Sequence, residues 1–192
     1  MRHKYETRGI VLSRTPFGET HAHLALLTPD LGLVWARAAG LRRTESKLAH
    51  ALVTFAESDV VLVRGREGWR VTGAILEVNW FSRLATLDAR YRAARVAGLL
   101  LRLSPGESPE HSPFAIITDF FEALAHEAEQ VREGAEMLAA AHLLATLGFA
   151  DVENAREEEV VSPFSPENLA RVADNRDRYI TRINRGIAAS GL

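Results

Sequence analysis

Apolar and polar residues alternate with a period close to two over the first eighty positions, which is the pattern of half-buried β-strands. Five short runs rich in β-branched and aromatic residues carry it, at 5–14, 22–28, 33–39, 53–63 and 69–78. Turn-forming residues separate most of these runs, at 15–18, 28–32 and 65–68. Each turn is short enough to join antiparallel neighbours. The pattern therefore predicts five antiparallel strands.

The gap between the third and fourth runs is longer and differs in kind. Residues 40–52 contain a short apolar set that is typical of a helix or a small lobe. A helix in that gap of a five-strand antiparallel set is the arrangement of an OB-fold, a small Greek-key barrel that often binds single-stranded nucleic acid. We therefore expect residues 1–80 to form an OB-fold nucleic-acid-binding domain.

After residue 80 the apolar period changes to about 3.6, which predicts helices. The first helix covers about 84–101 and ends at the Ser-Pro-Gly sequence 104–106. The second helix begins at Ser112 as N-cap, with Pro113 in the first turn. The third helix covers about 131–147 and ends at Gly148, a residue suited to a left-handed C-cap. Residues 81–150 are thus expected to form an α-helical domain.

The remainder of the chain consists of an acidic stretch and one more helical pattern. Residues 151–164 are expected to be an acidic linker. Ser165, followed by Pro166, predicts the N-cap of a single last helix over 165–192 that packs on the helical domain. The fold class predicted from all these patterns is α+β, with an N-terminal five-stranded OB-fold β-barrel followed by an all-α helical domain.

Composition narrows the possible functions. With 192 residues and 47% hydrophobic content, the chain can bury a substantial core. The absence of cysteine excludes disulfides, thiolate nucleophiles and cysteine-ligated metals. No apolar run approaches the roughly 18 residues of a membrane span, and the start leads into a strand rather than a signal-peptide core. We expect a cytoplasmic protein without membrane contact.

The net charge of −2 hides an uneven distribution. The first 80 residues hold 11 basic and 8 acidic residues, whereas the rest hold 12 and 17. The densest basic cluster, Arg42, Arg43 and Lys47, follows a strand in which Trp35 and Arg37 share one face. Two interpretations of this region remain open. In one, the cations contact phosphates and Trp35 stacks on a base; in the other, the cations belong to a solvated loop and Trp35 is a core residue.

Other candidate chemistry is weaker. His21 and His23 stand at strand spacing on one face, but no third metal ligand is evident. The sequence Gly65-Arg66-Glu67-Gly68 lacks the lysine of a phosphate-binding loop and is interpreted as a hairpin turn. No serine stands in a nucleophile elbow and no carboxylate pair is distinctive. We predict no catalytic residues, no metal site and no cofactor. Arginines on the last helix, including Arg178 and Arg182, form either a solvated face or a docking face for an acidic partner.

The order of short sequences along the barrel resembles the N-terminal domain of the bacterial RecO recombination mediator family. The matching sequences are TRGIVL at 7–12, PFGET at 16–20, LTP at 27–29 with Gly32, AGLRR at 39–43, SKL at 46–48 and LVTF at 52–55. The sequence ATLGF at 145–149 is similar to the leucine-glycine-aromatic sequence that closes the family's helical core. The resemblance covers about residues 5–150 and depends on this ordered series rather than on one motif.

The resemblance implies an OB-fold that binds single-stranded and duplex DNA in a protein without catalytic turnover. Such proteins anneal complementary strands and, with the partner RecR, help load recombinase onto DNA coated by single-strand-binding protein. Carried over by position, the implied DNA-binding residues are Arg14, Arg37, Arg42, Arg43 and Lys47, with Trp35 as a stacking residue. This implies a protein of DNA repair and recombination, associated with the nucleoid.

Two departures from the family pattern qualify these expectations. Many members carry a four-cysteine zinc module after the leucine-glycine-aromatic sequence, whereas residues 151–163 here contain no cysteine. Many also carry basic residues on the preceding helix that grip the tail of single-strand-binding protein, and here that helix lacks them. Arg92, Arg95, Arg178 and Arg182 are candidate replacements for partner binding. The alternative function is a protein-interaction scaffold whose barrel no longer binds DNA.

Overall fold

The computed structural model describes residues 4–19, 21–40, 47–108, 112–149 and 163–192, with Lys47 described by its backbone alone. The chain forms two compact units. The barrel unit comprises Met1–Arg83 together with Pro105–Phe114, and the helical unit comprises Leu84–Ser104 together with Ala115–Leu192. The boundary near residue 83 lies close to the predicted one at 80, but the return of Pro105–Phe114 to the barrel has no counterpart in the sequence pattern.

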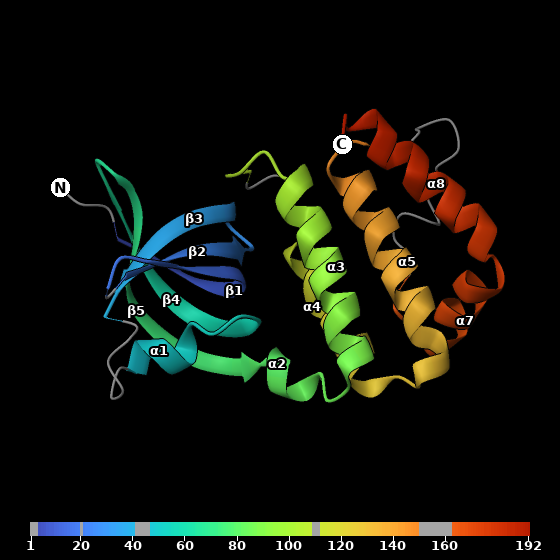
Figure 1. Cartoon of the computed structure of the whole chain (residues 1–192), viewed down its shortest axis with the longest axis horizontal. Coiled ribbons are helices and arrows are strands. Elements are labelled where there is room, and N and C mark those ends of the chain that lie inside the picture. Colours follow the sequence, from blue (N-terminus) through green and yellow to red (C-terminus); the bar gives the residue numbers. More distant parts are fainter. Residues whose placement is uncertain (1–3, 20, 41–46, 109–111, 150–162) are drawn as a thin grey trace. The chain divides into compact units, whose positions relative to one another are not determined.

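The barrel unit is a closed five-stranded barrel in the order β1-β2-β3-β5-β4, as Figure 1 shows in blue and teal. The strands are β1 (Lys4–Phe17), β2 (His21–Thr28), β3 (Gly32–Ala39), β4 (Ala56–Gly65) and β5 (Gly68–Asn79). The short helix α1 (Lys47–Ala51) lies between β3 and β4 in the chain. Only β3 and β5 pair in parallel, through Ala36–Ala38 and Trp69–Val71, which closes the barrel. The predicted OB-fold class is confirmed.

Alternate residues of the strands fill the barrel interior. The buried cluster includes Val11, Leu24 and Leu26, Val34, Ala36 and Ala38, Leu62, Trp69 and Val71. Because successive side chains of a strand point to opposite faces, the residues between these positions face outward. There they are exposed to solvent or covered by another segment of the chain. The core therefore determines which side chains of β2 and β3 lie on the outer surface.

The fourth strand begins later than the sequence pattern predicts. Residues 53–55 form a turn in which the amide of Ala56 donates to the carbonyl of Val53 (3.0 Å), and Phe55 has a φ of +62°. The amide of Phe55 donates to Val11 (2.7 Å), so the buried ring of Phe55 and its backbone are both held in place. The expectation of a strand from residue 53 was wrong because hydrophobicity alone does not reveal a left-handed turn residue.

The segment between the first two long helices is tied to the β2–β3 end of the barrel. Gly32 forms a bridge with Glu107, and the amide of Ser108 donates to the carbonyl of Leu31 (3.1 Å). Ser112 Oγ accepts from the amide of Phe114 (3.4 Å), as expected of a cap, and also donates to the carbonyl of Thr28 (2.7 Å). These bonds explain why Pro105–Phe114 belongs to the barrel unit.

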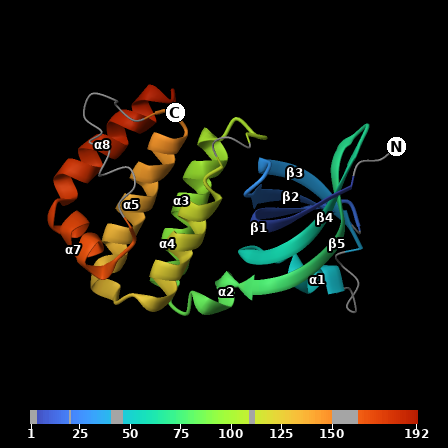
Figure 2. The same cartoon turned by 180° about the vertical axis from the view of Figure 1, so that it is seen from behind.

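The helical unit is built around α5 (Glu129–Thr146), which packs against α3 (Leu87–Leu103), α7 (Pro166–Asp174) and α8 (Arg176–Ala189). Figure 2 shows α3 and α4 (Phe114–His126) in green and yellow and the last two helices in red. A four-residue helix, α2 (Trp80–Arg83), follows β5 in the barrel unit. Gly148 has a φ of +80°, as expected for the left-handed cap after α5.

The predicted single last helix is two helices, which corrects the sequence-based expectation. Ser165 Oγ accepts from the amide of Asn168 at the start of α7, as predicted. The helix then ends at Asp174, and Asn175 (φ −102°, ψ +30°) separates α7 from α8. The Asn175 side chain donates to the carbonyl of Arg171 (2.8 Å). Asn competes for backbone hydrogen bonds in this way, which favours a break.

In the part of the chain that the structure describes, no helix combines the length and the apolar character that a membrane span requires.

Candidate nucleic-acid interface

A row of outward-facing side chains crosses four strands of the barrel. Backbone pairing aligns Thr15 of β1 with His23 of β2, His23 with Arg37 of β3, and Arg37 with Arg70 of β5. Residues that oppose each other in neighbouring strands lie on the same side of the sheet. Since Ala36 and Ala38 face the core, Arg37 lies on the outer side, and this row runs over the barrel surface.

Trp35 lies on the same outer side and is 56% exposed. This exposure excludes the interpretation of Trp35 as a core residue, because a core residue would be covered. A tryptophan that is more than half exposed on a strand leaves one face of a large ring available for stacking. The structure therefore places Trp35 and Arg37, two of the residues predicted from sequence, on one surface.

Phe17 adds a second exposed ring to this surface. It stands at the end of β1, is 55% exposed, and meets the His23 ring edge-on at a centroid distance of 4.6 Å. The guanidinium carbon of Arg37 lies 6.0 Å from the centre of the Phe17 ring. We call these four residues, Phe17, His23, Trp35 and Arg37, the outer β2–β3 face.

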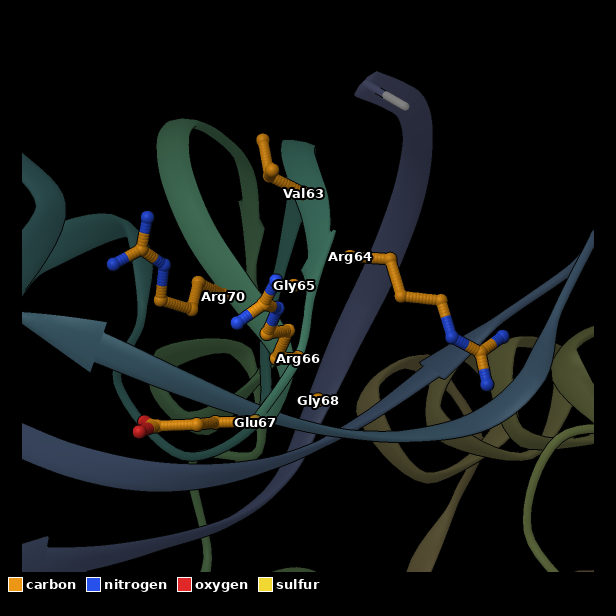
Figure 3. Close-up of a pocket in the computed structure, with 7 residues that line it drawn as sticks. All are labelled: Val63, Arg64, Gly65, Arg66, Glu67, Gly68 and Arg70. Atoms are coloured by element: carbon orange, nitrogen blue, oxygen red, sulfur yellow. The ribbon is translucent and has the colours of Figure 1, made fainter. Parts of the chain in front are cut away.

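The turn between β4 and β5 borders the outer β2–β3 face through Arg70. Gly65 and Gly68 pair with each other, so the loop consists of Arg66 and Glu67 alone. Gly68 has a φ of +94°, which a residue with a side chain adopts only with strain. We call residues 63–70 the β4–β5 hairpin tip. All of them except Trp69 line a hollow of about 810 Å³, and Figure 3 shows these lining residues.

Three arginines of the hairpin tip point in different directions. Figure 3 shows Arg70 and Glu67 on one side of the hairpin and Arg64 on the other. Arg64 lies over the ring of buried Trp69 (5.2 Å) and pairs with Glu107 (3.0 Å), which also accepts from Trp69 Nε1 (2.9 Å). Arg64 is thus held against Trp69 and Glu107, although its side chain is 58% exposed.

The other arginines of this region differ in their pairing. Arg37 forms an ion pair with Glu67 (2.9 Å). Arg66 and Arg70 are exposed, and among the described residues no carboxylate pairs with either of them. An exposed guanidinium without a partner can accept a phosphate without losing an existing ion pair. Among the described arginines of this surface, Arg66 and Arg70 are therefore free to contact an anion.

Of the remaining predicted DNA-binding residues, the structure describes only the side chain of Arg14, which does not join this surface. Arg14 opposes the core residue Leu24 in the β1–β2 pairing, and its guanidinium donates to the carbonyl of Leu52 (3.4 Å) while partly buried. It therefore lies on the inner side of the barrel wall, near its end. Arg42 and Arg43 fall outside the described residues, and of Lys47 only the backbone at the start of α1 is described.

Phe17, Arg66 and Arg70 were missed by sequence reasoning. The sequence Gly65–Gly68 was correctly interpreted as a hairpin turn, but its arginines were then left aside. In OB-folds, the β2–β3 face and the loops β1–β2 and β4–β5 are the surfaces that bind oligonucleotides. That rule, applied to the predicted strand order, would have selected Phe17 at the first loop and Arg66 at the second.

Two of the residues suggested for partner binding stabilise the helical unit. Arg92 bonds to Asp88 (2.8 Å) on α3 and to Glu136 (2.7 Å) on α5, and Arg95 contacts both carboxylate oxygens of Glu136. The hydrogen bond to Glu136 raises the pKa of Arg95. These contacts join α3 to α5. Arg178 and Arg182 lie one turn apart on α8, with Arg178 exposed and Arg182 partly so.

Metal-ligating side chains do not converge in the described part of the chain. No group of three or more His, Cys, Asp or Glu residues there has the proximity to hold a metal ion. His21 and His23 are two residues apart on β2, as predicted from their spacing.

Comparison with known proteins agrees with the barrel and extends into the helical unit. Residues 1–77 match the family model described as recombination protein O N terminal. Relatives named DNA repair protein RecO include one from Dehalococcoides mccartyi, 35% identical over 122 residues (64% of this chain, 48% of the relative). Another, from Rubrobacter xylanophilus, is 35% identical over 136 residues (71% and 53%).

A third relative with the same name, from a Synechococcus species, is 30% identical over 156 residues, or 76% of this chain and 55% of the relative. The chain thus spans about half the length of the curated relatives it matches. The family model covers most of the barrel, and the matches to these relatives are longer than the barrel unit. The chain belongs to the RecO family.

Proposed function

We propose that this chain acts in DNA repair by binding single-stranded DNA on the outer β2–β3 face and the β4–β5 hairpin tip. The observation that carries the proposal is the exposure of Trp35 and Phe17 beside Arg37 and Arg70 on one side of the barrel. Exposed aromatic rings next to arginines are the combination that binds unpaired bases and their phosphates together.

The chemistry of this surface favours single strands without a fixed sequence. Stacking of a base on an aromatic ring contributes about 1 to 3 kcal/mol, and every base offers such a face. Arginines that contact phosphates add affinity but do not identify bases. In duplex DNA the bases already stack on each other, so Trp35 and Phe17 gain little from it. Duplex binding would rely on the arginines alone.

Further parts of the proposed function come from the family. We propose that the protein anneals complementary strands, because neutralised phosphates repel each other less and let the bases pair. We also propose that it assists recombinase loading with a RecR-like partner and works at the nucleoid, without catalytic turnover. Arg178 and Arg182 on α8 remain candidates for contact with a partner or with the acidic tail of single-strand-binding protein.

A double charge reversal of the hairpin tip tests the DNA site. The variant Arg66→Glu/Arg70→Glu is expected to lower the affinity for a fluorescein-labelled oligo(dT) by at least about tenfold, measured by fluorescence anisotropy at low salt. Both side chains are exposed, so circular dichroism should show an unchanged fold. Arg102→Glu/Arg185→Glu, which reverses two exposed arginines of the helical unit, is the matched control.

Equal affinity of the double variant and the control would move the DNA site away from the hairpin tip.

The ion pairs Arg37–Glu67 and Arg64–Glu107 neutralise two barrel arginines, an observation that favours the alternative of a protein-interaction scaffold. A wild-type chain that captures a RecR-like protein but leaves the anisotropy of the oligonucleotide unchanged would establish that alternative and exclude the proposed DNA site.

A further inference from the structure

Glu67 is an acidic residue in the middle of the proposed DNA-binding surface. It occupies the two-residue loop of the hairpin tip beside Arg66, and it lies on the same side of the hairpin as Arg70 (Figure 3). Its carboxylate accepts from the Arg37 guanidinium at 2.9 Å. A carboxylate repels phosphate, so Glu67 opposes the binding of DNA by its neighbours Arg37, Arg66 and Arg70.

We propose that Glu67 limits the affinity of the barrel for DNA by holding Arg37 until a phosphate displaces it. This inference rests on the proposed function and adds to it a residue that opposes binding. In the free barrel Arg37 is paired with Glu67. A bound strand must separate this pair before Arg37 can contact a phosphate, and part of the binding free energy is spent on that separation.

The exposure of Glu67 argues against a mainly structural role. Its side chain is 82% exposed and that of Arg37 40% exposed, and ion pairs in such positions contribute little to stability because water screens them. Glu107 differs from Glu67 in its contacts with buried residues. Glu107 also pairs with an arginine, but it accepts from the ring nitrogen of buried Trp69 and lies in a segment bridged to Gly32, so it has a clear structural task.

The proposal has a functional consequence for annealing. A protein that brings two strands together must also let the product go. When Arg37 separates from a phosphate, it can form its ion pair with Glu67 again, and this favours release of the strand. We therefore expect removal of the Glu67 charge to tighten DNA binding through slower dissociation.

The test compares two substitutions that remove one negative charge each. Glu67→Gln keeps the size of the side chain and frees Arg37. Glu77→Gln is the matched control, because Glu77 is also exposed on the barrel and has no ion pair among the described residues. Ten residues separate the two positions along the hairpin, about 30 Å of strand. This exceeds the Debye length of roughly 10 Å at 0.1 M salt.

Glu67→Gln is expected to raise the affinity for oligo(dT) about three- to fivefold and to slow dissociation, whereas Glu77→Gln changes it less than about twofold. The slope of log K against log salt should change little, because Arg37 contacts a phosphate in the complex of either protein. In the Arg37→Gln background, Glu67→Gln should give much less than this gain, because the freed cation is no longer there.

The outcomes separate this inference from the proposed function. Failure of the wild-type barrel and of Glu67→Gln to bind oligo(dT) would overturn both. Wild-type binding with equal affinities for Glu67→Gln and Glu77→Gln would overturn the role of Glu67 and leave the DNA site intact. A full gain that persists in the Arg37→Gln background would overturn the role of Arg37 as the residue that Glu67 holds.

Discussion

At the scale of single residues, Trp35 shows that the sequence pattern predicts the side of a strand on which a residue lies but not its exposure. The period of two placed Leu33, Trp35 and Arg37 on one face of a strand, and that alignment is correct. Yet Leu33 is buried and Trp35 is exposed, two residues apart on the same side. Alternation reveals which residues share a side but not what covers that side. Parts of the chain far away in sequence provide such cover, and Glu107 forms a bridge with Gly32, the residue before Leu33.

The exposed ring of Trp35 leads to a prediction about strand preference. Trp35→Ala is expected to weaken binding to oligo(dT) by about five- to a hundredfold, as the loss of one stacked base predicts. Binding to a duplex of equal length should change much less, because its bases are not free to stack on the ring. Anisotropy with both oligonucleotides measures the ratio.

Stability supplies the control for this substitution. Trp35→Ala removes an exposed ring and should leave the unfolding midpoint within a few degrees of wild type, whereas Val34→Ala, its buried neighbour, should lower it measurably. Equal losses of single-strand and duplex affinity in Trp35→Ala would show that Trp35 does not act by stacking on unpaired bases.

At the scale of elements, local signals were sufficient for the strands, most helices and several caps. Gly148 and Ser165 stand where their chemistry predicted, and the helix between β3 and β4 identified the barrel topology. The break at Asn175 was missed because the apolar stripe continues across it, with Leu169 and Val172 before the break and Ile183 and Ile187 after it. A stripe of that kind reports burial and does not require one continuous helix.

The packing of α5 against α7 gives a prediction about stability. A Cβ atom added at Gly134 would collide with the backbone carbonyl of Leu169, and the backbone there cannot move without shifting α7. Gly134→Ala is therefore expected to lower the free energy of unfolding of the helical unit by about 1 to 3 kcal/mol. Urea denaturation followed by far-ultraviolet circular dichroism measures this change.

Gly98 on α3 offers the opposite case for the same substitution. Nothing lies within 4 Å of a Cβ atom added there. Gly98→Ala should stabilise the protein by about 0.5 to 1 kcal/mol, because alanine loses less conformational freedom in a helix than glycine. Stabilisation by both substitutions would show that α5 and α7 are not as closely packed at Gly134 as the structure indicates.

At the scale of the whole molecule, the net charge of −2 is a poor guide to function. The excess of positive charge in the first 80 residues is small, and Glu107, which lies outside them, offsets one of these charges by pairing with Arg64. What distinguishes the barrel is the arrangement of a few charges and rings on one side. That arrangement depends on the barrel class, which the sequence patterns predicted, and on the parallel pairing of β3 with β5, where they predicted antiparallel neighbours.

The same arrangement sets how strongly DNA binding should depend on salt. If Arg37, Arg66 and Arg70 each contact one phosphate, the slope of log K against log salt for a single strand is about −2. Affinity for oligo(dT) should then fall roughly twentyfold between 50 and 200 mM salt. Arg66→Glu/Arg70→Glu should flatten the slope toward that of one contact. A steeper wild-type slope would assign further phosphate contacts to other cations of the chain, whereas a flat one would mean that phosphates are not what this barrel binds.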